Sequence, residues 1–179
     1  MSKKVLILST SPRRNSNSEA LAEAFAKGAR DAENDVEIIR MRDKNYRFCL
    51  GCFACQKTGK CVIKDDMAEI VPEMERSDVL VFATPIYYYE MSGQMKTLLD
   101  RANPLFVADY RFRDVYFLSS AAEDEDYVPQ RAQSGLEGWI ACFEKARLAG
   151  TVFGGGATET GEIKGCPALD KAYEMGRAV

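Results

Sequence analysis

The chain has 179 residues, among them six cysteines and no histidine, and its formal net charge at pH 7 is −3. A chain of this length is expected to form one domain, residues 1–179, whose core needs no disulfides. The net charge and the lack of a basic tract argue against a nucleic-acid surface. The missing histidine excludes histidine-ligated zinc hydrolases, Ser/His/Asp triads and histidine general bases.

Short apolar runs alternate along the chain with segments whose apolar residues recur at helical spacing. The runs predicted to be strands are residues 5–8, 36–39, 79–83, 115–118 and 151–153. Helices are expected around residues 20–25, 67–74, 91–102, 136–143 and 169–173. Five strands that alternate with helices predict an α/β fold, with a parallel, doubly wound sheet and helices on both faces.

The loop after the first strand, residues 9–18, is polar and contains no glycine. A dinucleotide-binding Rossmann fold would place Gly-x-Gly-x-x-Gly there, so that fold is disfavoured. Hydroxyl groups and unpaired N–H groups at a helix N-terminus suit a monophosphate instead. The alternative is that Ser16, with Glu19 three residues later, only forms a capping box.

Four cysteines, Cys49, Cys52, Cys55 and Cys61, lie in one short segment after the second predicted strand. Their spacing permits an iron-sulfur cluster, an all-cysteine zinc site or a thiol–disulfide pair. Zinc is disfavoured, because its usual signature is two Cys-x-x-Cys pairs separated by a longer spacer. The thiols could also bind nothing and serve as small apolar side chains.

The remaining cysteines and one glycine run have simpler interpretations. Cys142 is expected in the core because it lies close to the apolar helix face of Trp139 and Phe143. Cys166 is interpreted as a structural thiol near the last helix. The three glycines at 154–156 favour a mobile connection over a close approach to a ligand.

Three motifs follow one another along nearly the whole chain. They are Ser-Thr-Ser-Pro-Arg at 9–13 with Ser-Asn-Ser at 16–18, the cysteine segment 49–61 with Asp-Asp-Met at 65–67, and Thr-Pro-Ile-Tyr-Tyr at 84–88 with Ser-Gly at 92–93. In this order they resemble the flavodoxin-like NAD(P)H-dependent FMN reductases, within them the iron-sulfur flavoprotein branch. The resemblance implies a single flavodoxin-like FMN-binding domain with a five-stranded parallel sheet of order 2-1-3-4-5.

The resemblance also implies where the cofactor lies. The FMN phosphate would be held by residues 9–18, and the isoalloxazine ring would lie against residues 85–88 and near the loop after the fourth strand. Ligands of such sheets bind at the carboxyl ends of the strands, where the strand order reverses, and aromatic side chains there can face a flat ring. The residues implied to bind the cofactor are Ser9, Ser11, Arg13, Asn15, Ser16, Asn17, Ser18, Pro85, Ile86, Tyr87, Tyr88, Ser119, Ser120 and Ala121.

Some of these side chains have alternative uses. The tyrosines could instead pack in the protein or at a subunit interface, an alternative that is more acceptable for Tyr89 than for Tyr87. Arg13 and Arg14 could meet the cofactor phosphate or the phosphates of a nicotinamide donor, and Arg14 could equally be a solvated charge.

For the four cysteines, the resemblance implies a [4Fe–4S] centre that passes electrons to FMN. Similar sequences include proteins that bind flavin and no cluster, so an empty loop stays open as an alternative. The candidate ligands of this centre are Cys49, Cys52, Cys55 and Cys61.

The implied function is an oxidoreductase in which NAD(P)H donates a hydride to FMN and the electrons pass to a free flavin, a quinone or an iron-sulfur partner. No residue of the chain is assigned as catalytic, because the flavin carries the chemistry. The alternatives are a non-catalytic carrier like flavodoxin or ferredoxin, and a flavin-free interaction domain with a zinc-stabilised loop.

The expected partners are a small-molecule or protein electron acceptor and other copies of the chain, as a homodimer or homotetramer. No window approaches the roughly 18 apolar residues of a membrane span, so no membrane partner is expected and the location is expected to be cytoplasmic.

Overall fold

The computed structural model describes residues 2–179. Five parallel strands form a sheet in the order β2-β1-β3-β5-β6. Their bounds are Lys4–Ser9 (β1), Asp35–Arg40 (β2), Val79–Tyr87 (β3), Asp114–Ser120 (β5) and Arg147–Gly154 (β6). The prediction of a parallel α/β sheet is therefore confirmed, and its five main strands lie in the expected flavodoxin-like order.

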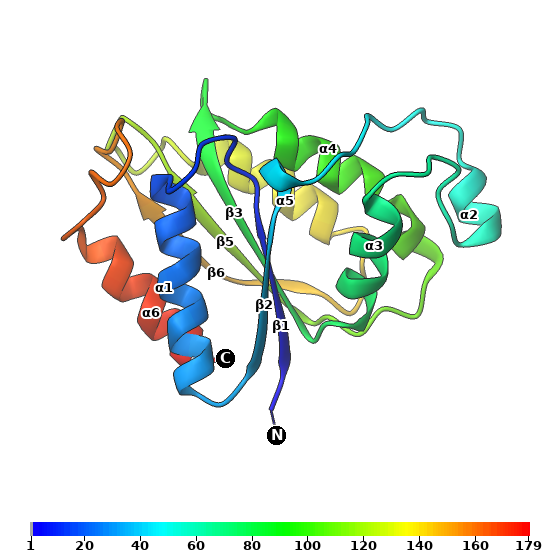
Figure 1. Ribbon diagram of the computed structural model, residues 1–179, viewed down its shortest axis with the longest axis horizontal. Helices are drawn as coiled ribbons and strands as arrows, with labels where there is room; N and C mark the ends of the chain where they lie inside the picture. The colour runs from blue at the N-terminus through cyan, green and yellow to red at the C-terminus, as the bar shows by residue number, and fades with distance from the viewer. Residues whose placement is uncertain (1) are drawn as a thin grey trace.

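The helices cover both faces of this sheet (Figure 1). They are α1 (Asn17–Asp31), α2 (Ala54–Thr58), α3 (Met67–Arg76), α4 (Gly93–Arg101), α5 (Gln130–Ile140) and α6 (Pro167–Arg177), with short 3-10 turns η1 (Met41–Asp43) and η2 (Asn103–Val107). Among residues 2–179, no helix is both long enough and apolar enough to cross a membrane.

Two hydrophobic cores form, one on each face of the sheet. The first packs α3, α4 and α5 against one face, and the second packs α1 and α6 against the other. Helices α1 and α6 approach so closely that a Cβ on Gly28 would lie 2.0 Å from the carbonyl oxygen of Tyr173, and one on Gly176 would lie 2.0 Å from that of Phe25. Strand β3 is buried on both faces, as expected for the central strand of a parallel sheet.

The predicted set of five strands was incomplete. A sixth strand, β4 (Glu90–Met91), pairs antiparallel with the end of β3 and turns the chain back before α4. The sequence analysis also missed α2, a five-residue helix inside the cysteine segment. Both elements are too short to show a periodic apolar pattern.

This topology brings the loops of interest to one end of the sheet. Because the strands are parallel, the loops after β1, β2, β3, β5 and β6 all leave from the carboxyl edge. The order reverses between β1 and β3, the position where such sheets bind ligands. The segment that contains α2 lies beyond α3 and α4, far from α1 and α6 (Figure 1).

Candidate functional site

The loop between β1 and α1 leaves several polar groups without partners. The hydroxyl of Ser9 is buried and has no hydrogen-bond partner in residues 2–179. Within residues 2–179, no backbone carbonyl accepts a hydrogen bond from the N–H of Ser11 or of Asn15 either. Asn15 has a left-handed backbone with φ of 51°. These donors, next to the positive end of the 15-residue helix α1, fit an anionic group such as a phosphate.

Only one of the two hydrogen bonds of the expected capping box forms in this loop. The Ser16 hydroxyl accepts from the backbone N–H of Glu19 at 3.2 Å and caps α1. The Glu19 carboxylate does not return to Ser16 but accepts from Arg42 at 2.9 and 3.0 Å and from Arg40 at 2.5 Å. Burial alone would raise the pKa of Glu19, but the hydrogen bonds from the two arginines outweigh it and lower that pKa. Glu19 therefore fixes α1 to the end of β2.

Asn17 is fully occupied by other parts of the protein. Its side-chain amide donates to the carbonyls of Ala157 and Glu159 at 3.1 and 2.9 Å. Its side-chain oxygen accepts from the N–H groups of Gly161 and Ile163 at 3.1 and 3.4 Å. The Asn17 side chain has no hydrogen-bonding capacity left for a ligand.

The two arginines of the loop point in different directions. Arg13 donates to the carbonyl oxygen of Thr158 at 3.0 Å. Arg14 pairs with Asp43 at 3.3 Å, and both side chains are exposed. Exposed contacts of this kind stabilise little, so both arginine side chains could exchange them for hydrogen bonds to a bound anion.

A buried hydroxyl network joins the first loop to the loop after β3. The Thr10 hydroxyl donates to the carbonyl oxygen of Ala83 at 3.0 Å and lies 3.2 Å from the Ser92 hydroxyl. Thr84 bonds to the same Ser92 hydroxyl at 3.1 Å, and Ser92 caps α4 by accepting from the N–H of Met95. The sequence analysis did not assign this network, although Ser92 has the spacing of a helix cap.

The chain between β3 and β4 makes a tight turn of two tyrosines. Tyr88 and Tyr89 have φ of 52° and 66°, a left-handed conformation that such turns usually reserve for asparagine or glycine. The Tyr88 ring is 97% exposed, whereas the Tyr89 hydroxyl donates to Glu123 at 3.1 Å. The Tyr89 contact with the loop after β5 agrees with the packing alternative considered for this residue.

A cavity of about 510 Å³ lies between this turn and the loop after β5. Its lining is mainly aromatic and aliphatic, and a flat ring system fits such a lining. The lining residues are Ile86, Tyr87, Tyr88, Tyr89, Ala121, Ala122, Glu123 and Val128. We call this cavity the aromatic crevice.

Four predicted cofactor residues, Ile86, Tyr87, Tyr88 and Ala121, line the aromatic crevice. Pro85, Ser119 and Ser120 lie outside that lining in the paired ends of β3 and β5. Ala122 belongs to the loop after the fourth predicted strand, which was expected near the ring, whereas Glu123 and Val128 carry no motif and were not predicted.

The glycine run after β6 packs against the protein. A Cβ on Gly155 would lie 2.5 Å from the Cα of Asp124, so only glycine permits this approach. The N–H of Gly156 donates to Glu123, and the N–H of Ala157 donates to Ala121. Instead of forming the mobile connection that was expected, this segment supports the loop that lines the aromatic crevice.

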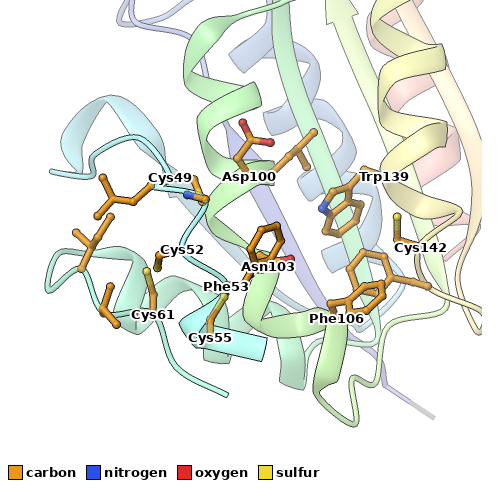
Figure 2. Close-up of a pocket in the computed structure, with 16 residues that line it drawn as sticks. Cys49, Cys52, Phe53, Cys55, Cys61, Asp100, Asn103, Phe106, Trp139 and Cys142 are labelled. Atoms are coloured by element: carbon orange, nitrogen blue, oxygen red, sulfur yellow. Dashed lines mark hydrogen bonds between the residues drawn. The ribbon is translucent and has the colours of Figure 1, made fainter. Parts of the chain in front are cut away.

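The four clustered cysteines line a second cavity, of about 380 Å³. Cys49 and Cys52 are exposed, Cys61 is half-buried and Cys55 is buried. Figure 2 shows these four on one side of the cavity and Trp139, Phe106 and Cys142 on the other. We call residues 48–62 the thiol loop.

The thiols fit a soft metal centre by their chemistry but are not gathered around one point. Thiolates are the preferred ligands of iron-sulfur clusters. In residues 2–179, however, no three cysteine, aspartate or glutamate side chains lie close enough together to hold a metal ion. Cluster binding would therefore require the thiol loop to close.

Cys142 is exposed, so the expectation that it belongs to the core was wrong. It follows the last residue of α5, where the helix face of Trp139 gives way to a turn. Its thiol lies on the wall opposite the four clustered cysteines (Figure 2). Cys166 is half-buried at the start of α6, in agreement with its assigned place.

A buried ion pair lies under the thiol loop. Arg101, the last residue of α4, donates two parallel hydrogen bonds to Asp65 at 2.7 and 2.8 Å. The side chains of Arg101 and Asp65 are 0% and 4% exposed. The hydrogen bonds from Arg101 hold the pKa of Asp65 below its usual range.

Sequence comparison connects this geometry with known proteins. The family described as NADPH-dependent FMN reductase matches residues 3–138. An iron-sulfur flavoprotein of Methanocaldococcus jannaschii is 35% identical over 102 residues, which cover 57% of this chain and 53% of that protein. An iron-sulfur flavoprotein of Archaeoglobus fulgidus is 33% identical over 114 residues, which cover 64% of this chain and 56% of the relative. The chain spans about half the length of the curated relatives it matches.

Solved structures share the fold at low sequence identity. An NAD(P)H:quinone oxidoreductase from Methanothermobacter marburgensis superposes with a TM-score of 0.77 at 21% identity, covering 99% of this chain and 96% of that one. An FMN-dependent NADH-azoreductase from Bacillus anthracis, solved in complex with FMN, gives 0.70 at 14% identity, with 99% of both chains covered.

Proposed function

The chain belongs to the NADPH-dependent FMN reductase family, and from this premise we propose that it is an FMN-dependent oxidoreductase that uses NAD(P)H as its hydride donor. The observation that carries the proposal is the pairing of two features at the carboxyl edge of the sheet. One is a loop with unpartnered donors, Ser9 among them, and the other is the aromatic crevice. A phosphate-bearing flat cofactor needs both.

Different residues would bind the phosphate and the ring of the cofactor. Ser9, Ser11 and Asn15 would donate to the phosphate, with the N-terminus of α1 adding its partial positive charge. Tyr87 and its neighbours in the aromatic crevice would hold the ring and exclude water from one side. The Tyr89–Glu123 hydrogen bond joins the two walls of the aromatic crevice and would keep it from opening.

Bound FMN would supply the redox chemistry, accepting a hydride and passing electrons onward. The chain would position the cofactor and control access to it, without a protein acid or base in the hydride transfer. This division suits a chain that has no histidine. The acceptor is a free flavin, a quinone or an iron-sulfur partner.

The thiol loop would hold a [4Fe–4S] centre through Cys49, Cys52, Cys55 and Cys61. The support is that all four thiols line one cavity and belong to a loop that leaves the same edge of the sheet as the loops of the proposed flavin site. The names of the related iron-sulfur flavoproteins agree with this assignment. Anaerobic purification followed by iron and sulfide analysis tests it, and a protein that takes up neither would leave a loop with free thiols.

We propose further that the chain assembles as a homodimer or homotetramer in the cytoplasm. Six free cysteines suit a reducing compartment. Exposed aromatic side chains near both cavities, Tyr88 and Phe53, would be covered by a second copy. Light scattering of the FMN-loaded protein measures the assembly.

Comparison of FMN with riboflavin tests the cofactor site. If the loop after β1 binds the phosphate, FMN should bind at least about 100-fold more tightly than riboflavin, which lacks it. Ser9→Ala should weaken FMN binding by about tenfold and leave riboflavin binding unchanged. Ser134→Ala, on the exposed face of α5, is the matched control and should change neither. Equal affinity for the two flavins would contradict the phosphate assignment.

Steady-state oxidation of NADH and NADPH tests the activity. The FMN-loaded chain should oxidise at least one of them with a quinone or free flavin as acceptor. Tight FMN binding without turnover on any of the three acceptor classes would contradict the reductase and favour the electron carrier.

A further inference from the structure

The thiol loop is closed at its base by a double set of hydrogen bonds. Asn45 donates its N–H to the Asp66 carboxylate at 2.7 Å, and its carbonyl accepts from the N–H of Asp66 at 3.1 Å. Arg47 donates its N–H to the Asp65 carboxylate at 3.0 Å. The two ends of the loop are therefore held side by side before the first cysteine and after the last.

Arg101 joins this base to the core of the protein. Besides its paired bonds to Asp65, it donates to the carbonyl oxygen of Arg47 at 2.6 Å. One guanidinium thus binds both ends of the loop from the end of α4. A buried arginine with an aligned carboxylate is rigid, because its fork geometry and its desolvation both oppose movement.

The same region of the chain also contacts the thiols. Asn103, two residues after Arg101, donates to the Sγ of Cys55 at 3.0 Å. The Nε–H of Arg101 is buried and has no acceptor in residues 2–179. A fixed cation with one free donor therefore lies next to a loop whose ligands would become negatively charged when they bind a metal.

Between its fixed ends, and apart from the buried Cys55 in α2, the thiol loop has exposed apolar side chains. Phe48, Leu50, Phe53 and Val62 are each more than half exposed. Phe53 also has a left-handed backbone, with φ of 55°. Movement of these residues would expose little additional apolar surface, so the middle of the loop can close at low cost while its base stays in place.

We propose that Arg101 is the positioning residue of the thiol loop: it fixes the base of the loop, so that Cys49, Cys52, Cys55 and Cys61 reach one centre when residues 48–62 close. The proposal rests on the proposed metal site of this loop. It does not depend on the reductase activity, because the Arg101 contacts lie outside the aromatic crevice.

Anaerobic titration of the reduced full chain with Co²⁺ tests this role, because thiolate coordination of Co²⁺ gives an intense absorption. Arg101→Met should weaken Co²⁺ binding by about 10- to 100-fold, the usual effect of removing a group that orients metal ligands. Arg101→Lys, which keeps the charge but loses the fork, should recover part of the affinity. Arg147→Met removes an exposed arginine that also pairs with an aspartate and should have no effect.

A second variant separates positioning from folding. Arg101→Met combined with Asp65→Leu removes both buried charges and avoids leaving one unpaired. Its FMN affinity should equal that of the wild type, its Co²⁺ affinity should fall as in Arg101→Met, and the amides of residues 48–62 should exchange faster. Wild-type Co²⁺ affinity in this folded double variant would overturn the proposal.

Binding measurements on the wild-type chain distinguish a failure of this proposal from a failure of the proposed function. If it binds FMN but no Co²⁺, the metal site and the positioning role both fail, whereas the FMN-dependent function stands. If it binds Co²⁺ with the predicted dependence on Arg101 but no FMN, the proposed reductase fails and the positioning role stands.

Discussion

The aromatic crevice and the thiol loop both follow strands that end at the carboxyl edge of the sheet, but they are built differently. The end of β3, which forms one wall of the crevice, is joined to the loop after β1 by the buried network of Thr10, Thr84 and Ser92 before any ligand arrives. The thiol loop is held at its base by Arg101 and is apolar and exposed between its ends. The first would be a preformed site, whereas the second would need its ligand to complete it.

The largest expected effect comes from breaking the base of the thiol loop. Arg101→Met leaves the buried Asp65 carboxylate without its counter-charge and should lower the free energy of unfolding by about 3 to 5 kcal/mol. Urea denaturation measures it. Arg147→Met, which removes an exposed ion pair, should show no measurable change. Equal stability of the two variants would mean that the loop base contributes nothing to the folded state.

The hydroxyl network behind the crevice should be the next most sensitive feature. Ser92→Ala removes the cap of α4 and leaves the Thr10 and Thr84 hydroxyls without their shared partner, so unfolding should become easier by about 2 kcal/mol. Thermal unfolding followed by circular dichroism measures the loss. Ser134→Ala is the control, and a Ser92→Ala variant as stable as this control would show that the crevice is not preformed.

The tyrosine turn should respond in the opposite direction. In protein dilute enough to be monomeric, Tyr88→Gly relieves a left-handed backbone and should raise the free energy of unfolding by about 0.5 to 1 kcal/mol, despite the greater freedom of glycine in the unfolded chain. Gly156→Ala, at φ of 69°, is the matched reverse change and should destabilise. Destabilisation by Tyr88→Gly would indicate that the Tyr88 side chain packs in solution.

The smallest effect is expected in acid. The pKa of Asp65 is depressed in the folded state, so its contribution is present above the ordinary pKa of 3.8 and is lost as the pH falls through the folded value. Between pH 5 and pH 3, the wild type should lose more stability than Asp65→Asn. Only the first part of this loss falls in that window, because the folded pKa lies below the ordinary one. If the stability of the two proteins fell in parallel over this pH range, a depressed pKa of Asp65 would be contradicted.

The sequence predicted the features that repeat or lie in long periodic segments. Five apolar runs gave the parallel strands, because a strand such as β3, buried on both faces, must be apolar throughout. The hydroxyl-rich loop after β1 was predictable, because unpartnered polar residues before a helix suit an anion. The cysteine spacing indicated one shared centre, whereas in residues 2–179 the four thiols line a common cavity without meeting at one point.

The missing features depend on contacts between distant segments. Asn17 matched a binding motif, yet its amide is used by a segment about 140 residues later. Arg101 resembles any charged residue at the end of an amphipathic helix, and only the fold shows that its side chain is fully buried. The turn at Tyr88 lacked the usual asparagine or glycine, so β4 gave no local signal.

The most direct test of the difference between the two regions is FMN affinity in a variant with all four thiol-loop cysteines replaced by serine. A preformed crevice that is independent of the thiol loop predicts a dissociation constant for FMN within about threefold of the wild type, less than 1 kcal/mol. A folded variant that binds FMN more than about tenfold more weakly would contradict that independence.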